Sequence, residues 1–386
     1  MKTLLSILLA VVLAAEGLAQ QTLQSKIDSL LASEPMLETS QLGIMVYDLT
    51  ADSALYQYHH RQTMRPASTM KVVTAVTALD RLGGDYQLKT ELYYTGEVVD
   101  STLWGSLYLV GGMDPMFGIN DLRDFADRVR QLGIHTLRGS IVTDRSMKDE
   151  LEWGEGWCWD DDNPALSPLL VERRTDFLER MVTELTAVGI ALDSVTTFEE
   201  RPPLDAIPLA VCRHSIDELL LRMMKDSDNL YAECLYYQLA ASFGHQPARA
   251  AHARAIEKQL VKQIGLDSSR YRFADGSGLS LYNYVSPELL TMLLRYAWKE
   301  PRIYSHLLPS LPVAGEDGTL KKRMKKTAAA GNVRAKTGTL TGIISLAGYL
   351  TASNGHELCF AIINQGVLSG KEARILQDKL CNVLCE

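Results

Sequence analysis

Apolar residues recur at helical spacing in the stretch that follows Pro66. Val72, Val76 and Leu79 fall on one side of a helix, and the residues between them are mostly small or apolar. A helix that is apolar on most sides is typically buried inside a domain. The pattern therefore predicts a central helix that begins just after Pro66 and ends at Gly83.

Strands and further helices are predicted on both sides of this helix. Strands are expected at 42–49, 54–56, 88–94, 103–110, 137–143, 192–198, 333–336, 343–350 and 357–363. Helices are expected at 23–31, 122–132, 177–188, 216–225, 230–242, 248–264, 287–298 and 371–384. The last three strands should form an antiparallel sheet that the final helix closes.

The order of these elements suggests two interleaved domains. Strands alternate with helices from residue 86 up to Pro202-Pro203, whereas the chain beyond is mostly helical before its last strands. We interpret 86–204 as an inserted mixed β/α domain. Residues 20–85 and 205–386 then form one discontinuous domain.

The N-terminus has the pattern of a signal peptide. Lys2 precedes an apolar run from Leu4 to Ala15, and the small residues Gly17 and Ala19 fit cleavage after Ala19. The run is short for a membrane span, and no later stretch is long and apolar enough. We expect residues 1–19 to be removed and the mature protein to be exported, periplasmic and at most peripherally associated with a membrane.

Composition and charge narrow the class of protein. Hydrophobic residues make up 46% and charged residues 22% of the 386 residues, which is typical of a soluble globular protein. The net charge is −8, and removing one Lys and one Glu with the leader leaves it unchanged. An acidic chain without a basic face gives no support for nucleic-acid binding.

Cysteine and histidine spacing does not predict a metal or cofactor. The chain has 6 cysteines, and their pairing is open because isolated buried thiols are as plausible as disulfides in an exported protein. No His-Glu-x-x-His arrangement occurs, and the acidic run 160–162 lacks ligand spacing. We therefore expect no metal and no cofactor.

Ser68 and Lys71 are the first candidate chemical pair. Ser68 falls in the first turn of the central helix, and Lys71 lies one turn deeper on the same face. A hydroxyl with an amine beside it can be an activated nucleophile. Taken alone, however, Ser68 is better explained as a helix cap than as a nucleophile.

Two further short motifs change that interpretation. Ser227-Asp228-Asn229 lies in a break between two helices, and Lys336-Thr337-Gly338-Thr339 lies at the end of a strand before a turn. Each of the patterns Ser-x-x-Lys, Ser-x-Asn and Lys-Thr-Gly occurs once. Their order and their contexts of helix start, interhelical loop and strand end are those of an active-site serine hydrolase.

With these motifs the chain resembles the penicillin-recognising serine hydrolases. It is most similar to the D-alanyl-D-alanine carboxypeptidase/endopeptidase family, peptidase family S13, which comprises low-molecular-mass class C penicillin-binding proteins. The resemblance covers nearly all of the mature chain. It also rests on Pro66-Ala67-Ser68, Gly111-Gly112-x-Asp114-Pro115, Trp157-x-Trp159-Asp160-Asp161, Asp275-Gly276-Ser277-Gly278-Leu279-Ser280 and Asp317-Gly318-Thr319-Leu320.

The resemblance implies an α/β (α+β) fold of the penicillin-binding-protein and β-lactamase type. In that fold an antiparallel sheet flanked by helices joins an all-helical part, here with an inserted β/α domain. The implied catalytic residues are Ser68 as nucleophile, Lys71 as its base and Ser227 as a proton relay. The implied substrate-binding residues are Asn229, Lys336, Thr337, Gly338 and Thr339, and the backbone N–H groups of Ser68 and Thr339 form the implied oxyanion hole.

The implied reaction is release of D-alanine from peptidoglycan stem peptides through an acyl-enzyme on Ser68. Cleavage of peptide crosslinks is the same chemistry with another leaving amine, and penicillins should acylate Ser68. The alternatives are a serine β-lactamase, a transpeptidase and a catalytically silent peptidoglycan-binding protein. Burial and the charge of Lys336 are both expected to lower the pKa of Lys71. The oligomeric state is left open.

Overall fold

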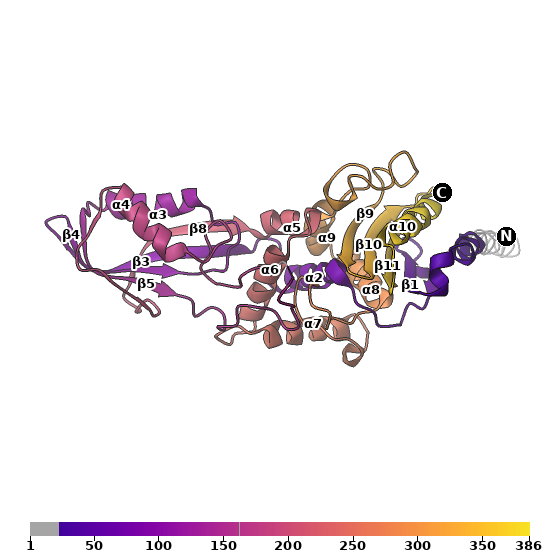
Figure 1. The fold of residues 1–386 in the computed structure, drawn as a ribbon, viewed down its shortest axis with the longest axis horizontal. Helices are drawn as coiled ribbons and strands as arrows, with labels where there is room; N and C mark the ends of the chain where they lie inside the picture. The colour runs from indigo at the N-terminus through magenta and orange to yellow at the C-terminus, as the bar shows by residue number, and fades with distance from the viewer. Residues whose placement is uncertain (1–22, 162) are drawn as a thin grey trace, which may run out of the picture.

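The computed structural model describes residues 23–161 and 163–386, so the predicted leader lies outside the described residues. The molecule is elongated, with one sheet near each end and a group of helices between them (Figure 1). The chain runs from the first sheet into the helices, out to the second sheet and back, and both described ends lie beside the first sheet (Figure 1).

The first sheet has five antiparallel strands in the order β2-β1-β11-β10-β9. These are β1 (Gln41–Asp48), β2 (Ser53–Tyr58), β9 (Arg334–Leu340), β10 (Ile343–Thr351) and β11 (Glu357–Gln365). Alternate residues of β10 enter two different cores. Ala347 and Tyr349 pack with the central helices, whereas Leu346 and Leu350 pack with the closing helix α10 (Gly370–Cys385). Both faces are covered, so the central strands read as continuous apolar runs.

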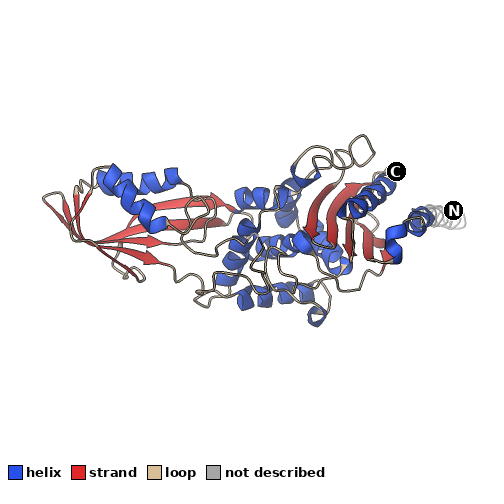
Figure 2. Cartoon of the chain, viewed as in Figure 1, coloured by secondary structure: helices blue, strands red, loops and turns tan. Residues whose placement is uncertain are grey.

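The middle of the molecule is helical (Figure 2). Its helices are α2 (Met70–Leu82), α5 (Ile216–Lys225), α6 (Asn229–Ala241), α7 (Ala250–Gln263), α8 (Pro287–Lys299) and α9 (Pro301–Ser310). Short 3-10 turns are η1 (Pro35–Glu38), η2 (Ala67–Thr69), η3 (Ser268–Arg270) and η4 (Gly318–Leu320). Helix α2 contacts all five other helices of this group, and every residue from Met70 to Leu79 is buried. The predicted buried helix is confirmed.

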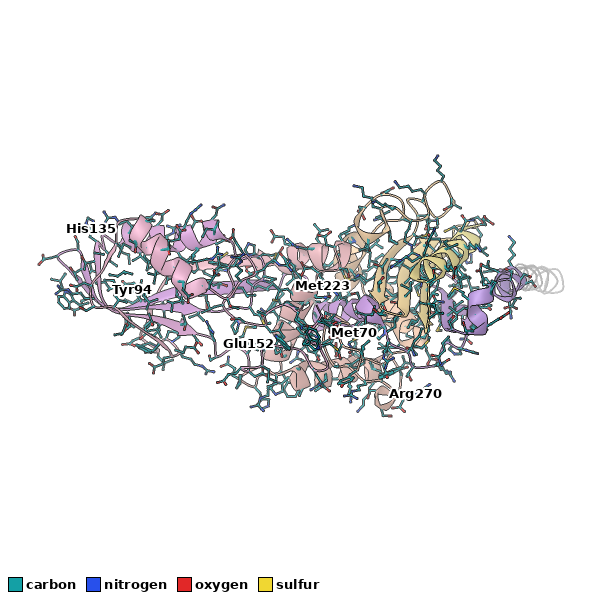
Figure 3. The ribbon with its side chains drawn as sticks, in the orientation of Figure 1. Met70, Tyr94, His135, Glu152, Met223 and Arg270 are labelled. Carbon is teal, nitrogen blue, oxygen red and sulfur yellow. The ribbon has the colours of Figure 1, made fainter. Side chains whose placement is uncertain are left out.

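The second sheet is mixed and has the order β6-β5-β4-β3-β8, with β7 paired to β5. Its strands are β3 (Gln87–Val99), β4 (Thr102–Val110), β5 (Thr136–Asp144), β6 (Ala191–Leu192), β7 (Thr196–Glu199) and β8 (Ile207–Ser215). Helices α3 (Ile119–Gln131) and α4 (Phe177–Ala187) share a separate core with it. Side chains such as Tyr94 and His135 therefore lie far from Met70 (Figure 3).

Strand β8 bears on where the insert ends. It pairs with β3 along the register from Gln87 with Ser215 to Tyr94 with Ile207. The predicted end at residue 204 would separate this strand from the sheet that it completes. We therefore propose that the inserted domain extends over 87–215.

Two element predictions were wrong in detail, and two elements were missed. The expected strand at 192–198 is two short strands, β6 and β7. Helix α9 and strand β8 were not predicted. Strand β9 continues through the Lys336 motif to Leu340 instead of ending at Lys336. The general α/β class, with an antiparallel sheet and flanking helices, is confirmed.

Two further sequence expectations concern membrane-spanning segments and the pairing of the cysteines. Within the described ranges, no helix is long and apolar enough to cross a bilayer. All six cysteines lie in described residues and are free, and four of them are buried: Cys234, Cys359, Cys381 and Cys385. The interpretation of isolated thiols, rather than disulfides, therefore describes this structure.

Candidate active site

Ser68 lies in η2, the single 3-10 turn that leads into α2. The backbone before it is strained, because Ala67 has a φ of 49°. Gly278 packs against this turn so closely that a Cβ there would lie 1.9 Å from the Ala67 carbonyl oxygen. Thr69 Oγ1 donates to the Pro66 carbonyl at 2.7 Å. These contacts hold Ser68 half-exposed at the start of the buried helix.

Lys71 is completely buried, and its amine donates to three acceptors. Lys71 Nζ lies 3.0 Å from Ser68 Oγ, 2.8 Å from Asn229 Oδ1 and 2.8 Å from the Ser277 carbonyl oxygen. One amine thus connects the start of α2, the start of α6 and the loop at 274–280. An ammonium group has three N–H donors, so each of them has a partner.

The second buried amine belongs to Lys336 on β9. Lys336 Nζ donates to Ser227 Oγ and to the Thr337 carbonyl oxygen, both at 2.8 Å. Ser227 has a φ of 62°, an uncommon value for a non-glycine residue. The turn between α5 and α6 therefore bends sharply at the residue whose hydroxyl faces Lys336.

Strand β9 reaches η2 because of Gly338. A Cβ at this position would lie 2.1 Å from Ser345 Oγ, 2.7 Å from the Pro66 carbonyl oxygen and 3.0 Å from Ser68 N. Only glycine allows this approach of β9 to the backbone of Ser68. The flanking side chains have partners of their own. Thr337 Oγ1 donates to Thr319 Oγ1 at 2.8 Å, and Arg374 donates to Thr339 Oγ1 at 3.3 Å.

Comparison with known proteins gives the family of the chain. The family model of the D-Ala-D-Ala carboxypeptidase 3 (S13) family matches residues 23–170 and 169–385. The chain belongs to this family. It is therefore a serine-type D-Ala-D-Ala carboxypeptidase, and the family predicted from its motifs is confirmed.

Curated relatives match over most of their length. A D-alanyl-D-alanine carboxypeptidase of Actinomadura sp. (strain R39) is 29% identical over 96% of this chain and 86% of the relative. A carboxypeptidase DacB of Mycolicibacterium smegmatis is 30% identical over 90% of this chain and 82% of the relative.

Solved structures show the same fold. Penicillin binding protein 4 (dacB) of Haemophilus influenzae has a TM-score of 0.85 and 23% identity, and the match covers 93% of this chain and 99% of that one. A predatory endopeptidase of Bdellovibrio bacteriovorus has a TM-score of 0.62 and 18% identity, with 89% of this chain and 91% of that one covered.

The electrostatics of this S13 site follow from burial of the two amines. Burial lowers the pKa of Lys71 to about 8, although the carboxylates of Asp275, Glu233 and Asp228 act in the opposite direction. Burial and then the charge of Lys71 hold the pKa of Lys336 well below its usual value. The expected effect of burial on Lys71 is thus confirmed, whereas the charge of Lys336 is not among the causes of its shift; the effect between the two amines falls on Lys336 instead.

A network of carboxyl groups supports the loop that carries Ser277. Glu233 accepts from the backbone N–H groups of Gly276 and Ser277, at 3.1 and 2.8 Å to Oε1. Burial raises the pKa of Glu233. Asp275 accepts from Trp157 Nε1 at 2.8 Å, so a residue of the insert fixes this loop. The loop in turn presents the carbonyl that holds Lys71.

A second residue of the insert reaches the turn that carries Ser227 and Asn229. Arg173 forms an ion pair with Asp228, the middle residue of that turn. Arg222 approaches the same Asp228 oxygen at 3.2 Å. The other oxygen of Asp228 caps α6 by accepting from the backbone of Tyr231.

All eight predicted site residues lie in one region of the structure, and contacts within it join the three motifs. Sequence reasoning did not assign site roles to the residues that support them: Trp157, Arg173, Glu233, Asp275, Ser277 and Thr319. Asp275, Ser277, Thr319 and Trp157 lie in segments that carried the family resemblance. Glu233 and Arg173 had no sequence signal, because each contacts a segment that is distant in the sequence. Glu233 accepts from backbone N–H groups, and Arg173 pairs with the carboxylate of Asp228.

The close approach at Gly338 yields a prediction. Gly338→Ala should lower kcat/KM for D-alanine release by about 100-fold, because the added methyl group pushes β9 away from Ser68 and a displacement of about 1 Å can have that effect. The rate of D-alanine release is measured with purified enzyme. Gly118→Ala is the matched control. A Cβ added at Gly118 would lie no closer than 3.7 and 3.9 Å to its two nearest atoms, which is ordinary van der Waals contact. Equal activity of Gly338→Ala and the control would show that the close approach of β9 to Ser68 does not matter for D-alanine release.

Proposed function

We propose that this protein is an exported D-Ala-D-Ala carboxypeptidase and endopeptidase that cleaves peptidoglycan stem peptides and crosslinks through an acyl-enzyme on Ser68, and that penicillins acylate the same serine. The observation that carries the proposal is the 3.0 Å contact between Lys71 Nζ and Ser68 Oγ in a buried setting. Family membership supports the substrate class.

The first step is attack by Ser68. Lys71 in its neutral form accepts the Ser68 proton, and the oxygen attacks the carbonyl carbon of the penultimate D-alanine. The carbonyl oxygen becomes an oxyanion, for which the backbone N–H groups of Ser68 and Thr339 are the proposed donors. Losing one such donor typically lowers the rate by about 10²–10³. Gly338 allows these two backbone segments to approach each other.

The second step is departure of the terminal D-alanine. Ser227 gives its hydroxyl proton to the leaving nitrogen and takes in its place the proton that Lys71 received from Ser68, so that Lys71 is neutral again before hydrolysis. The hydrogen bond that Ser227 Oγ accepts from Lys336 at 2.8 Å orients the hydroxyl for this relay. Lys336, Thr337 and Thr339 bind the terminal carboxylate of the substrate. A carboxylate beside Lys336 favours the charged form of that amine and offsets part of its desolvation.

Asn229 completes the acyl side of the site. Its carbonyl oxygen is used by Lys71, which leaves the amide N–H₂ to donate to the backbone of the substrate. Water then hydrolyses the ester on Ser68, and the shortened stem peptide is released. A crosslink differs from a stem peptide only in the amine that leaves, so one set of groups serves both reactions.

Export rests on the sequence of the first 19 residues. A charged start, an apolar run and small residues before the cleavage position support a cleavable leader. Peptidoglycan lies outside the cytoplasmic membrane, so the proposed substrate requires this location. The periplasm is the proposed compartment.

The nucleophile is tested by Ser68→Ala. The variant should lose all labelling by a fluorescent penicillin and keep its native circular dichroism spectrum, because only the attacking oxygen is removed. Ser269→Ala is the control, since Ser269 is exposed and bonds only to Asp267. Labelling that persists in Ser68→Ala would refute the assignment. Steady turnover of benzylpenicillin by the native enzyme, without a lasting adduct, would favour a β-lactamase instead.

The base is tested by the pH dependence of acylation. Lys71 accepts a proton only when neutral, so the acylation rate should rise with pH and level off above its pKa of about 8. An ordinary lysine would place this rise near pH 10.4. The second-order rate constant with a penicillin is measured by stopped flow. A profile that is flat between pH 6 and about pH 9 would contradict the role of Lys71.

The substrate is tested with purified muropeptides. Incubation of pentapeptide monomers should remove one terminal alanine, and incubation of crosslinked dimers should split them into monomers. Mass spectrometry separates these outcomes because each product has its own mass. A catalytically silent binding protein would leave both substrates unchanged.

A further inference from the structure

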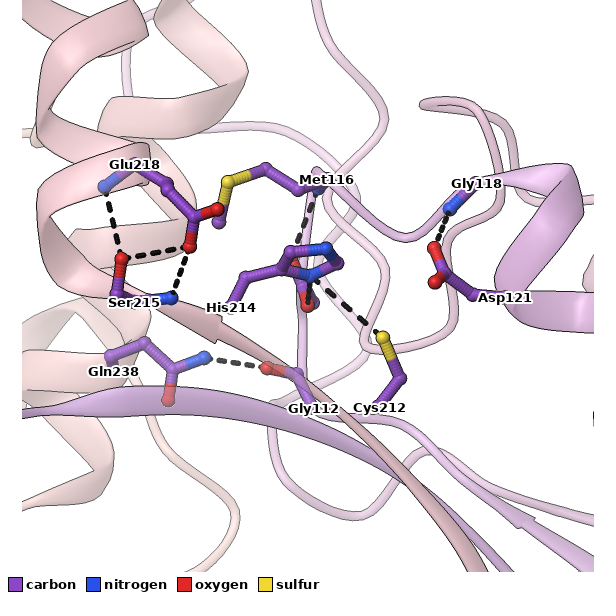
Figure 4. A network of polar contacts seen from close by, with 10 residues as sticks. Gly112, Met116, Gly118, Asp121, Cys212, His214, Ser215, Glu218 and Gln238 are labelled. Atoms are coloured by element: carbon purple, nitrogen blue, oxygen red, sulfur yellow. Dashed lines mark hydrogen bonds and ion pairs between the residues drawn. The ribbon is translucent and has the colours of Figure 1, made fainter. Parts of the chain in front are cut away.

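A cluster of three possible metal ligands lies where the insert joins the helices, away from Ser68. Asp114 is on the loop after β4, and Cys212 and His214 are on β8. One ligand atom of each residue lies within 4.8 Å of the other two. Figure 4 shows the His214 ring above Cys212, with Gln238 and Gly112 nearby.

The contacts of His214 converge on one atom. Nδ1 lies 2.6 Å from Asp114 Oδ2 and 3.9 Å from Cys212 Sγ. A Cys-His-Asp catalytic triad needs the thiol and the carboxylate on opposite ring nitrogens, so this arrangement does not fit nucleophilic catalysis. A single proton on Nδ1 can form a good hydrogen bond to only one of its two neighbours. A divalent cation, by contrast, can bind Nδ1, Asp114 Oδ2 and Cys212 Sγ together.

The spacing is close to that of a tetrahedral zinc site. With zinc bonds of about 2.0–2.3 Å, neighbouring ligand atoms lie roughly 3.3–3.7 Å apart. Asp114 Oδ2 would retreat and Cys212 Sγ would approach by less than about 1 Å to reach such distances. Thiolate, imidazole and carboxylate together form a donor set that suits zinc better than calcium or magnesium.

The surroundings have two features of a built metal site. Asp114 is buried, and its other oxygen accepts from the backbone N–H of Met116 at 2.9 Å, which fixes the orientation of the carboxylate. Cys212 lines a hollow of about 540 Å³ whose wall also includes Asp121 and Asp124. The hollow gives a cation a path from solvent to Cys212, along a wall that carries Arg128 and Arg213 as well as acidic residues.

We propose that Asp114, Cys212 and His214 bind one zinc ion, which ties the loop after β4 to strand β8. The same loop is held to α6 by Gln238, which donates to the Gly112 carbonyl at 2.5 Å. Strand β8 continues through Ser215 directly into α5. The ion therefore stiffens the junction between the insert and the helical part.

Cobalt titration of the metal-stripped full-length mature protein tests the site. One equivalent of Co²⁺ should produce an absorption band from sulfur-to-cobalt charge transfer, and Zn²⁺ should abolish the band by displacement. Native protein that shows no such band, or needs many equivalents, would overturn the proposal and leave Asp114 and His214 as a plain ion pair. This measurement needs no variant, so it does not depend on the folding of a mutant.

Cys212→Ser locates the ion. Its zinc affinity, measured by competition with a chromophoric chelator, should fall by at least the 10–100-fold that loss of an outer partner typically causes. Cys158→Ser is the matched control, because Cys158 is also free and is exposed. His214→Gln is a second variant with the same expectation. Unchanged affinity in both Cys212→Ser and His214→Gln would overturn the assignment, whatever the activity toward muropeptides.

Discussion

Burial of two amines is the constraint on which the rest of the site depends. Lys71 and Lys336 have no exposed surface, and an ammonium group without partners is costly in a protein interior. Each amine is therefore surrounded by oxygen acceptors from other segments: Ser68, Asn229 and Ser277 around Lys71, and Ser227 and Thr337 around Lys336. The need to satisfy these two groups brings α2, β9, the α5–α6 turn and the 274–280 loop together. The same burial that costs stability lowers the pKa of Lys71 to about 8, near the range in which it can exchange protons.

Much of this arrangement could be predicted from the sequence, because the central helix and the three motifs depend on residues that are close together in the chain. The apolar spacing after Pro66 identified α2, and the three motifs contain every residue that the two amines contact except Ser277. The wrong and missed elements have physical explanations. Pro301 and Pro309 read as helix breakers, but Pro301 occupies the first turn of α9, where its missing N–H is harmless. Strand β8 lies at the edge of its sheet, has Pro208 as its second residue and is mostly half-buried, so it lacks the alternation that marks a strand.

The parts of the site that sequence reasoning missed are tertiary contacts through the backbone. The Ser277 carbonyl and the N–H groups that bind Glu233 carry no residue-type signal, since any residue supplies them. The Asp114, Cys212 and His214 cluster was missed for another reason. Asp114 lies 100 residues before His214, so no local ligand spacing exists. Such a cluster becomes visible only after the strands of the insert are placed.

The insert contacts two different segments that support the site around Ser68, and this bears on what the insert does. Trp157 fixes Asp275 behind the loop that holds Lys71, and Arg173 pairs with Asp228 between Ser227 and Asn229. A movement of the insert relative to the helices would therefore act on the proposed base, Lys71, and on the proposed proton relay, Ser227, at the same time. A domain that only enlarged the binding surface would need neither contact. The positions of these two residues favour an insert that keeps the catalytic groups in register, and a metal-stiffened junction at β8 would serve the same end.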